Sequence, residues 1–167
     1  MDPRLSIIFS RRSIRKYRAA PVSDADLRSL LEAAMAAPSA NNSRPLSFVI
    51  VREPETLRRL AAAHPHAKML DGAALAVAVC ADPAASGSWV VDGSAATENL
   101  LVAAAGIGLG GVWLGVTGSD ERERAIRPIL GIPDSTRIVS LVSIGYPAES
   151  KEPRTQYDEA RVHHERW

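Results

Sequence analysis

The spacing of apolar residues along the chain predicts several amphipathic helices. The clearest one follows Pro21, where Leu27, Leu30 and Leu31 recur at helical spacing behind Ser23, a typical N-cap residue. This helix is expected to end before the next proline. The same spacing predicts further helices at 55–63, 95–105 and 119–130, and a short helical lead at 5–10.

Continuous apolar runs bounded by turn residues predict strands between these helices. The strongest run is 73–81, which is nearly all alanine, valine and leucine, so we expect a central strand that is covered on both faces. Cys80 lies within this run. We interpret it as a small buried hydrophobic residue rather than a nucleophile, because nothing nearby would lower the pKa of its thiol. Further strands are predicted at 47–51, 112–116 and 137–144.

The composition is that of one ordinary globular domain. Of the 167 residues, 46% are apolar and 23% are charged. The chain has 20 Lys and Arg against 19 Asp and Glu, and this net charge of +1 argues against a general nucleic-acid or anionic-membrane binder. The single cysteine excludes an intramolecular disulfide, and no segment has the pattern of a signal peptide or a transmembrane helix. We therefore expect a cytoplasmic protein with no nucleic-acid or membrane partner.

Positive charge is concentrated near the start of the chain. Five of the 20 Lys and Arg residues fall within the eight residues from Arg11 to Arg18. The guanidinium groups of Arg11, Arg12 and Arg15 present planar sets of donors that suit phosphate oxygens. Ser13 adds a short hydroxyl donor between them. The stretch predicts a phosphate site, and a solvated basic turn without a ligand is the alternative.

A loop of small polar residues lies between Pro38 and Pro45. Such residues cannot sustain a helix, and their size lets the backbone approach a flat ligand closely. Ser39, Asn41 and Asn42 would offer that ligand hydrogen-bond donors and acceptors. The alternative is that the loop is only a connector.

Two other motifs resemble binding signatures but lack the context that those signatures need. Residues 106–111 match G-x-G-x-x-G, yet a predicted helix precedes them and a predicted strand follows, the reverse of a dinucleotide-binding turn. We expect them to end a helix and turn the chain. His64-Pro65-His66 has no Cys, Asp or Glu at ligand spacing, so we expect an exposed turn and no metal site there.

The last part of the chain, 148–167, is mostly polar and ends in Trp167. It has too few apolar residues to build a core of its own. We expect this tail to pack on another surface, such as a second subunit.

Several motifs occur together in order: Arg11-Arg12-Ser13-Ile14-Arg15, Pro38-Ser39-Ala40-Asn41-Asn42-Ser43 followed by Pro45, a helix at 92–105, Gly108-Leu109-Gly110-Gly111-Val112-Trp113-Leu114-Gly115, and the terminal Arg154 and Trp167. In this combination the chain resembles the FMN-dependent nitroreductase family, in particular its shorter members, over essentially its whole length. The resemblance implies a single domain, 1–167, with an α+β sandwich fold in which helices surround a central, mostly antiparallel sheet. It also implies a homodimer with two FMN sites at the interface.

The resemblance further implies where FMN would bind. Its phosphate would be held by Arg11, Ser13 and Arg15, with contributions from Arg12 and Arg154. Pro38, Ser39, Ala40 and Asn42 would line the isoalloxazine and the ribityl chain. The backbone of Trp113, Leu114 and Gly115 would face flavin N5, where a fixed N–H donor favours the reduced state without a titratable side chain. We therefore name no catalytic side chain.

The implied reaction is hydride transfer from NADH or NADPH to flavin N5, followed by electron transfer at the same site to a nitroaromatic, quinone or similar small oxidant. Two alternatives stay open: another flavin reaction on the same fold, such as dehalogenation or flavin fragmentation, and a flavin-binding carrier or sensor without turnover. Three positions depart from the family's usual residues. Arg44 and Glu98 stand where glutamine is common, and Leu46 where an aromatic is common. Arg44 would add charge near the flavin or favour acidic substrates, and Leu46 would open space.

Overall fold

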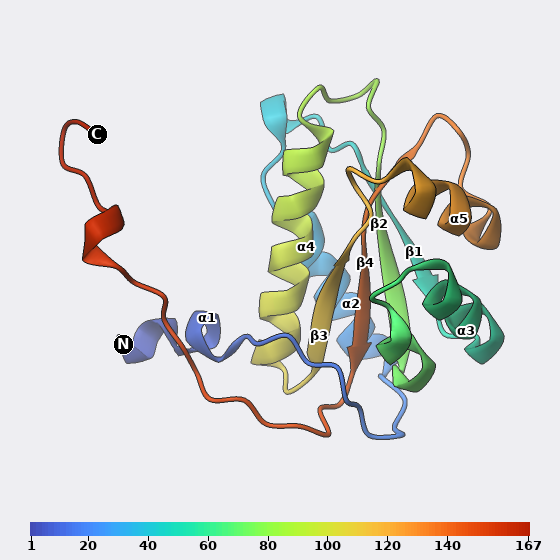
Figure 1. Ribbon diagram of the computed structural model, residues 1–167, viewed down its shortest axis with the longest axis horizontal. Coiled ribbons are helices and arrows are strands. Elements are labelled where there is room, and N and C mark those ends of the chain that lie inside the picture. Colours follow the sequence, from blue (N-terminus) through green and yellow to red (C-terminus); the bar gives the residue numbers. More distant parts are fainter.

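The predicted apolar runs form one antiparallel sheet. In the computed structural model, which describes residues 1–167, the strands lie in the order β1-β2-β4-β3 and every neighbouring pair is antiparallel (Figure 1). Their bounds are Leu46–Val51 for β1, Leu75–Ala81 for β2, Gly110–Gly115 for β3 and Arg137–Gly145 for β4. Every residue of β2 is buried, which confirms the expectation of a central strand covered on both faces.

Helices cover both faces of this sheet (Figure 1). The pair α2 (Asp24–Met35) and α4 (Trp89–Gly106) packs on one face, and the pair α3 (Pro54–Ala63) and α5 (Asp120–Leu130) on the other. Shorter helical segments are α1 (Ser6–Ser10) and four 3-10 turns at Pro3–Leu5, Ala40–Asn42, Lys68–Gly72 and Glu159–Arg161. The predicted α+β sandwich is confirmed.

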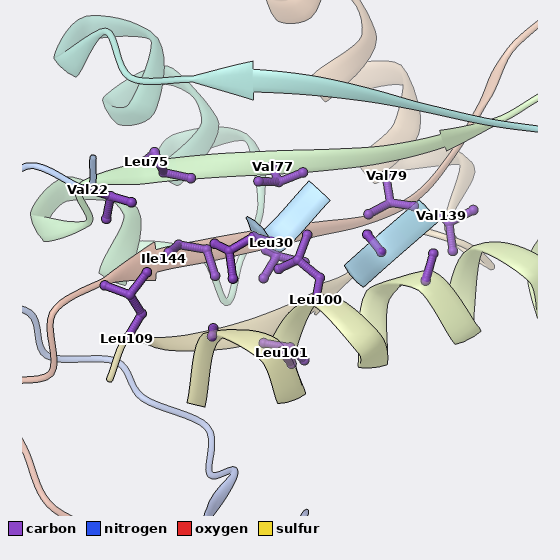
Figure 2. Close-up of a cluster of buried hydrophobic side chains, with 14 of the residues drawn as sticks. Val22, Leu30, Leu75, Val77, Val79, Leu100, Leu101, Leu109, Val139 and Ile144 are labelled. Atoms are coloured by element: carbon purple, nitrogen blue, oxygen red, sulfur yellow. The ribbon is translucent and has the colours of Figure 1, made fainter. Parts of the chain in front are cut away.

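Alternate side chains of β2 divide between two hydrophobic cores, as the two-residue period of a strand requires. Leu75, Val77 and Val79 face α2 and α4 (Figure 2), whereas Ala76 and Cys80 face α3 and α5. Cys80 is only 1% exposed, and this burial raises the pKa of its thiol to about 11. A thiol in this state is a poor nucleophile, so the interpretation of Cys80 as a buried hydrophobic residue is confirmed.

Helix α4 begins at Trp89, six residues before the predicted start of its regular part. Gly93 reads as a helix breaker in the sequence, but in the fold it is the point of closest approach between α4 and β4. A Cβ atom at Gly93 would lie 2.5 Å from a methyl group of Val139. The tertiary contact therefore overrides the weak helix propensity of glycine. At its other end α4 stops at Gly106 and β3 begins at Gly110, so the glycine-rich residues between them turn the chain, as predicted.

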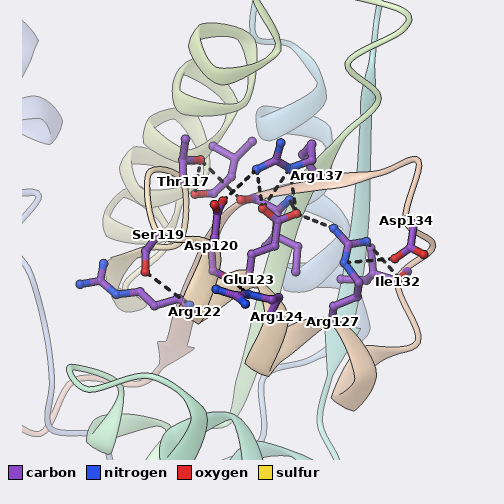
Figure 3. Close-up of polar contacts among 12 residues, drawn as sticks. Thr117, Ser119, Asp120, Arg122, Glu123, Arg124, Arg127, Ile132, Asp134 and Arg137 are labelled. Carbon is purple, nitrogen blue, oxygen red and sulfur yellow. Dashed lines mark hydrogen bonds and ion pairs between the residues drawn. The ribbon is translucent and has the colours of Figure 1, made fainter.

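Helix α5 is fixed to the sheet by a buried carboxylate. Ser119 caps the helix by accepting a hydrogen bond from the Arg122 backbone N–H, and Gly131 ends it with a left-handed φ of 64°. Glu123, which is 5% exposed, accepts from Arg127 at 2.5 Å and from Arg137 of β4 at 2.9 Å (Figure 3). Two arginines thus neutralise one buried charge between helix and strand.

The two ends of the chain run side by side along one border of the sheet. Ser13 forms a parallel bridge with Gly111, where the Ile14 N–H donates to the Gly111 carbonyl at 2.9 Å. After β4 the chain returns past the same segment, and the Arg154 N–H donates to the Phe9 carbonyl at 3.0 Å. The first and last parts of the sequence therefore meet next to the start of β3.

Beyond Arg154 the chain leaves the body of the molecule (Figure 1). Residues 155–167 are exposed throughout, including Tyr157 at 70% and Trp167 at 101%. The tail thus buries none of its apolar side chains on its own subunit. None of the helices combines the length and apolar character that a membrane crossing requires.

Candidate functional site

Cations from both ends of the chain gather at the start of β3. We call Arg11, Arg12, Arg15, Lys151 and Arg154 the basic cluster. The Arg12 guanidinium donates to the Glu152 carbonyl, and Lys151 donates to the Ser13 carbonyl. Together with the bond between Arg154 and Phe9, these contacts hold residues 151–154 against residues 9–15. The structure therefore places the segment that carries Arg11, Arg12, Ser13 and Arg15 beside the segment that carries Arg154.

Glu149 fixes the backbone of this basic stretch. Its carboxylate accepts hydrogen bonds from the backbone N–H groups of Arg15 at 2.5 Å and Lys16 at 3.2 Å. The bond from Arg15 is the main cause that lowers the pKa of Glu149 below its usual value, and the Lys151 charge adds to this effect. Glu149 therefore stays ionised and keeps the stretch extended.

Glu98, one of the three departures from the family pattern, lies against the basic cluster. The Arg11 Nε atom is 3.1 Å from Glu98 Oε1, and both side chains keep contact with solvent. The glutamate thus satisfies part of the Arg11 charge. An anionic ligand at this arginine must compete with that carboxylate.

The 38–45 loop is anchored by a buried aspartate that the sequence analysis did not identify. Asp92, in the first turn of α4, is 4% exposed. It accepts from the Ala40 backbone N–H at 3.0 Å and from the Ser86 hydroxyl at 2.7 Å. Asn41 and Asn42 have left-handed φ angles of 53° and 55°, which asparagine tolerates better than most residues. Asparagine at these two positions thus suits the left-handed backbone of the loop.

A cavity of about 530 Å³ opens beside this loop. Its wall consists of Met35, Ala36, Ala37, Pro38, Ser39, Asn42, Arg44, Leu46 and Phe48. Three of the four loop residues predicted to line a flavin, Pro38, Ser39 and Asn42, belong to it. The volume lies within the range of small-molecule sites.

The C-terminal end of β3 presents its backbone to solvent. β3 pairs with β4 on one edge only, and on its other edge the bridge at Ser13 is the single backbone pairing. A Cβ atom built on Gly115 would meet nothing within 4 Å, so a flat group can approach the peptide there. Trp113 and Leu114 precede it on the same strand.

Two side chains hold the Gly115 carbonyl in place. It accepts from Nε2 of His64 at 3.0 Å and from the Arg122 guanidinium at 3.0 Å. The His66 N–H donates to Nδ1 of His64 at 3.1 Å, so the proton of the neutral ring lies on Nε2. His64 is 2% exposed, and this burial lowers the pKa of its ring. The expectation of an exposed turn is therefore wrong for His64, although Pro65 and His66 are exposed.

The 38–45 loop and the basic cluster lie at opposite ends of α4 within one chain. Asp92 contacts the loop in the first turn of the helix, whereas Gly106, its last residue, packs against Ile7 just before the basic stretch. The fourteen residue steps from Asp92 to Gly106 correspond to about 21 Å of helix. Arg11 reaches back along the helix to Glu98, which lies six residues, or about 9 Å, from Asp92.

Comparison with known proteins identifies the family. The model of the Nitroreductase family matches residues 8–89 and 64–146. The chain belongs to the nitroreductase family. A protein of Archaeoglobus fulgidus, provisionally named NADH dehydrogenase/NAD(P)H nitroreductase, is 44% identical over 174 residues and covers 100% of both chains.

Solved structures of the family have the same fold. An FMN-dependent nitroreductase from Clostridium difficile is 29% identical, with a TM-score of 0.93 over 98% of this chain and 99% of that one. The NADPH:FMN oxidoreductase of Vibrio harveyi, solved in complex with NAD+, is 25% identical, with a TM-score of 0.85 over 98% of this chain and 77% of that one.

Proposed function

We propose that this chain is an FMN-dependent oxidoreductase that takes hydride from NADH or NADPH and passes electrons to a small oxidant, such as a nitroaromatic or a quinone, in a ping-pong reaction. The observation that carries the proposal is the position of the basic cluster at the start of β3, whose open edge leads to Gly115. An elongated ligand along this edge would touch the cations at one end and the exposed peptide at the other. Membership of the nitroreductase family supports this assignment.

The basic cluster fits the phosphate of FMN. Arg11, Ser13 and Arg15 would hold it, with Arg12 and Arg154 beside them, through charge-assisted hydrogen bonds. Neighbouring backbone groups already hold the segment in its extended form, so binding need not order it. The cluster is local on a chain of net charge +1, which favours a small anion over a polyanion.

The peptides of Trp113, Leu114 and Gly115 fit the ring end of the same ligand. When bound there, FMN would supply the hydride chemistry, and the chain would supply orientation and backbone donors. The contacts of His64 and Arg122 hold the Gly115–Val116 peptide, whose N–H already donates to the Val139 carbonyl at 3.3 Å, and so limit movement of the strand end. The N–H groups that precede it on β3 would then keep their direction as charge develops on the ligand, so the protein would need no acid or base of its own.

We further propose a homodimer in which 1–167 acts as one domain. Membership of the nitroreductase family supports a site between subunits, in which the 38–45 loop of a second copy would lie next to the basic cluster of the first. Pro38, Ser39, Ala40 and Asn42 would then complete a site between subunits. The first part of the predicted tail, 148–154, packs on its own chain, so the prediction that 148–167 packs on a partner would hold only for 155–167, which would bury the exposed Trp167 there. The single, buried Cys80 suits the reducing cytoplasm, where we place the protein.

The visible absorption spectrum of the purified protein tests the proposal. We expect flavin bands that bleach on anaerobic addition of NADH or NADPH and return when a nitroaromatic or a quinone is added. Bands that persist with both nucleotides would overturn the reductase assignment in favour of a flavin-binding protein without turnover. A protein that takes up no FMN even when soaked in it would contradict the whole assignment.

A further inference from the structure

The cavity beside the 38–45 loop has walls of two different kinds. The loop contributes polar atoms, whereas α2 and β1 contribute Met35, Leu46 and Phe48. These three apolar side chains are not among the residues predicted to touch the flavin. A ligand that fills the cavity must therefore carry an apolar body, whose burial would drive binding.

Arg44 is the one charged residue that lines this cavity. Its backbone has a left-handed φ of 51°, and its N–H donates to the Ser39 hydroxyl at 3.0 Å. Its Nε atom donates to the Asn42 side-chain oxygen at 3.1 Å. These two contacts hold the residue within the loop and leave the terminal guanidinium nitrogens without a protein acceptor. None of the ion pairs in the structure includes Arg44.

We propose that this cavity selects oxidants with an anionic group on a flat apolar body, such as aromatic carboxylates, and that Arg44 determines this specificity. The inference rests on the proposed function, because it concerns the second substrate of the same site. The apolar body would lie against Met35, Leu46 and Phe48. The carboxylate would accept two parallel hydrogen bonds from the planar guanidinium, a geometry that a lysine could not offer.

The phosphate groups of the nicotinamide nucleotides are the other source of an anion for Arg44. NADPH carries one phosphate more than NADH, so the two nucleotides differ in charge at a place remote from the nicotinamide. Separating the two half-reactions distinguishes these sources. An oxidant contact affects reoxidation of the enzyme, whereas a nucleotide contact affects its reduction.

The test compares 4-nitrobenzoate with 4-nitrobenzamide, a neutral probe of similar shape. The FMN-loaded enzyme is reduced with one equivalent of NADH without oxygen and then mixed with either probe. Overall, one NADH and one proton reduce the nitro group to a nitroso group, and NAD+ and water are the other products. We expect the native enzyme to reoxidise about ten- to a hundredfold more efficiently with the benzoate, the range of a charge-assisted hydrogen bond. Arg44→Gln should abolish this preference.

Two further variants sharpen the comparison. Arg28→Gln makes the same change in charge on the exposed side of α2, where Arg28 pairs with Glu32 at 3.0 Å, and should keep the preference. Leu46→Trp would place a large ring in the cavity. It should raise the KM for both probes, because both carry the same ring.

The outcomes separate this inference from the proposed function. If the native protein binds no FMN, or neither NADH nor NADPH reduces it, both are wrong. If the flavin is reduced and reoxidised but Arg44→Gln keeps the preference for the benzoate, only the inference is overturned. If Arg44→Gln changes the ratio of NADPH to NADH in the reductive half-reaction alone, the anion at Arg44 is a nucleotide phosphate and the assignment to the oxidant is wrong.

Discussion

Asp92 accepts a hydrogen bond from the backbone of Ala40, a residue 52 positions earlier in the sequence, at 3.0 Å. This hydrogen bond joins the first turn of α4 to the 38–45 loop. The Asp92 carboxylate is buried and also accepts a hydrogen bond from the Ser86 hydroxyl. The position of the loop therefore depends on one side chain from a distant element.

Removal of this anchor should loosen the loop. We expect Asp92→Ala to lower the free energy of unfolding by about 1–3 kcal/mol, because the Ala40 N–H and the Ser86 hydroxyl lose a buried acceptor. FMN affinity should fall with it, as measured by titration of the apoprotein. Asp92→Asn, which keeps an acceptor oxygen, should lose less of both. Equal FMN affinity in the native protein and Asp92→Ala would show that the loop does not contribute to flavin binding.

Single replacements in the basic cluster should weaken FMN binding. We expect Arg11→Ala and Arg15→Ala each to cost about 1.5–3 kcal/mol, because each removes a charge-assisted contact to phosphate. Arg59→Ala, on the exposed side of α3, is the matched control. Riboflavin has no phosphate, so its affinity should change little in either variant. If both variants purify with a full complement of FMN, the phosphate assignment is wrong.

Breaking the ion pair between Arg11 and Glu98 should raise FMN affinity, whereas replacing the arginines lowers it. Glu98→Gln removes a carboxylate that competes with the ligand phosphate for Arg11. Because the pair is solvent-exposed in part, we expect FMN affinity to rise by only about 0.2–1 kcal/mol. Glu32→Gln, which breaks the exposed pair with Arg28, should leave the affinity unchanged. A weaker affinity in Glu98→Gln would mean that the glutamate orients the arginine for the ligand.

His64 should make the stability of the fold depend on pH. Burial lowers the pKa of its ring in the folded protein, whereas the unfolded chain binds a proton near pH 6.5. The unfolded state therefore takes up more protons as the pH falls below about 6.5, and the free energy of unfolding decreases until the folded ring is protonated too. Urea titrations between pH 8 and pH 5 measure this slope.

His64→Gln is the informative variant for this prediction. Glutamine can donate to the Gly115 carbonyl and accept from the His66 N–H, but it does not titrate. The decrease in stability below about pH 6.5 should therefore be smaller in His64→Gln than in the native protein. Identical slopes in the two proteins would refute the role of His64, since the other histidines, such as His66 and His163, are exposed.

Local patterns predicted most of the fold. The apolar run at 73–81 gave β2 because a strand buried on both faces needs no alternation. Ser119 and Gly131 fixed the ends of α5 because capping is a local interaction. The start of α4 was missed, since the contact between Gly93 and Val139 arises only when helix and strand pack together.

The parts of the site that escaped prediction are those held by contacts between distant residues. Asp92, Glu149 and Arg122 act on backbone groups of other elements, and nothing in their local sequence identifies those partners. His64 was predicted to lie in an exposed turn because Pro65 follows it and no Cys, Asp or Glu stands at ligand spacing nearby. Only the folded chain shows that the ring is buried against the Gly115 carbonyl.

The hydrogen bond between Phe9 and Arg154 joins a part of the basic cluster that is synthesised first to a part that is synthesised last. Arg11, Arg12 and Arg15 leave the ribosome early, but residues 151–154 emerge only after every strand of the sheet has been made. A nascent chain thus carries Arg11, Arg12 and Arg15 for almost the whole of translation without the segment that completes the cluster. If the cluster holds the FMN phosphate as proposed, the complete site forms only when synthesis of the chain is nearly finished.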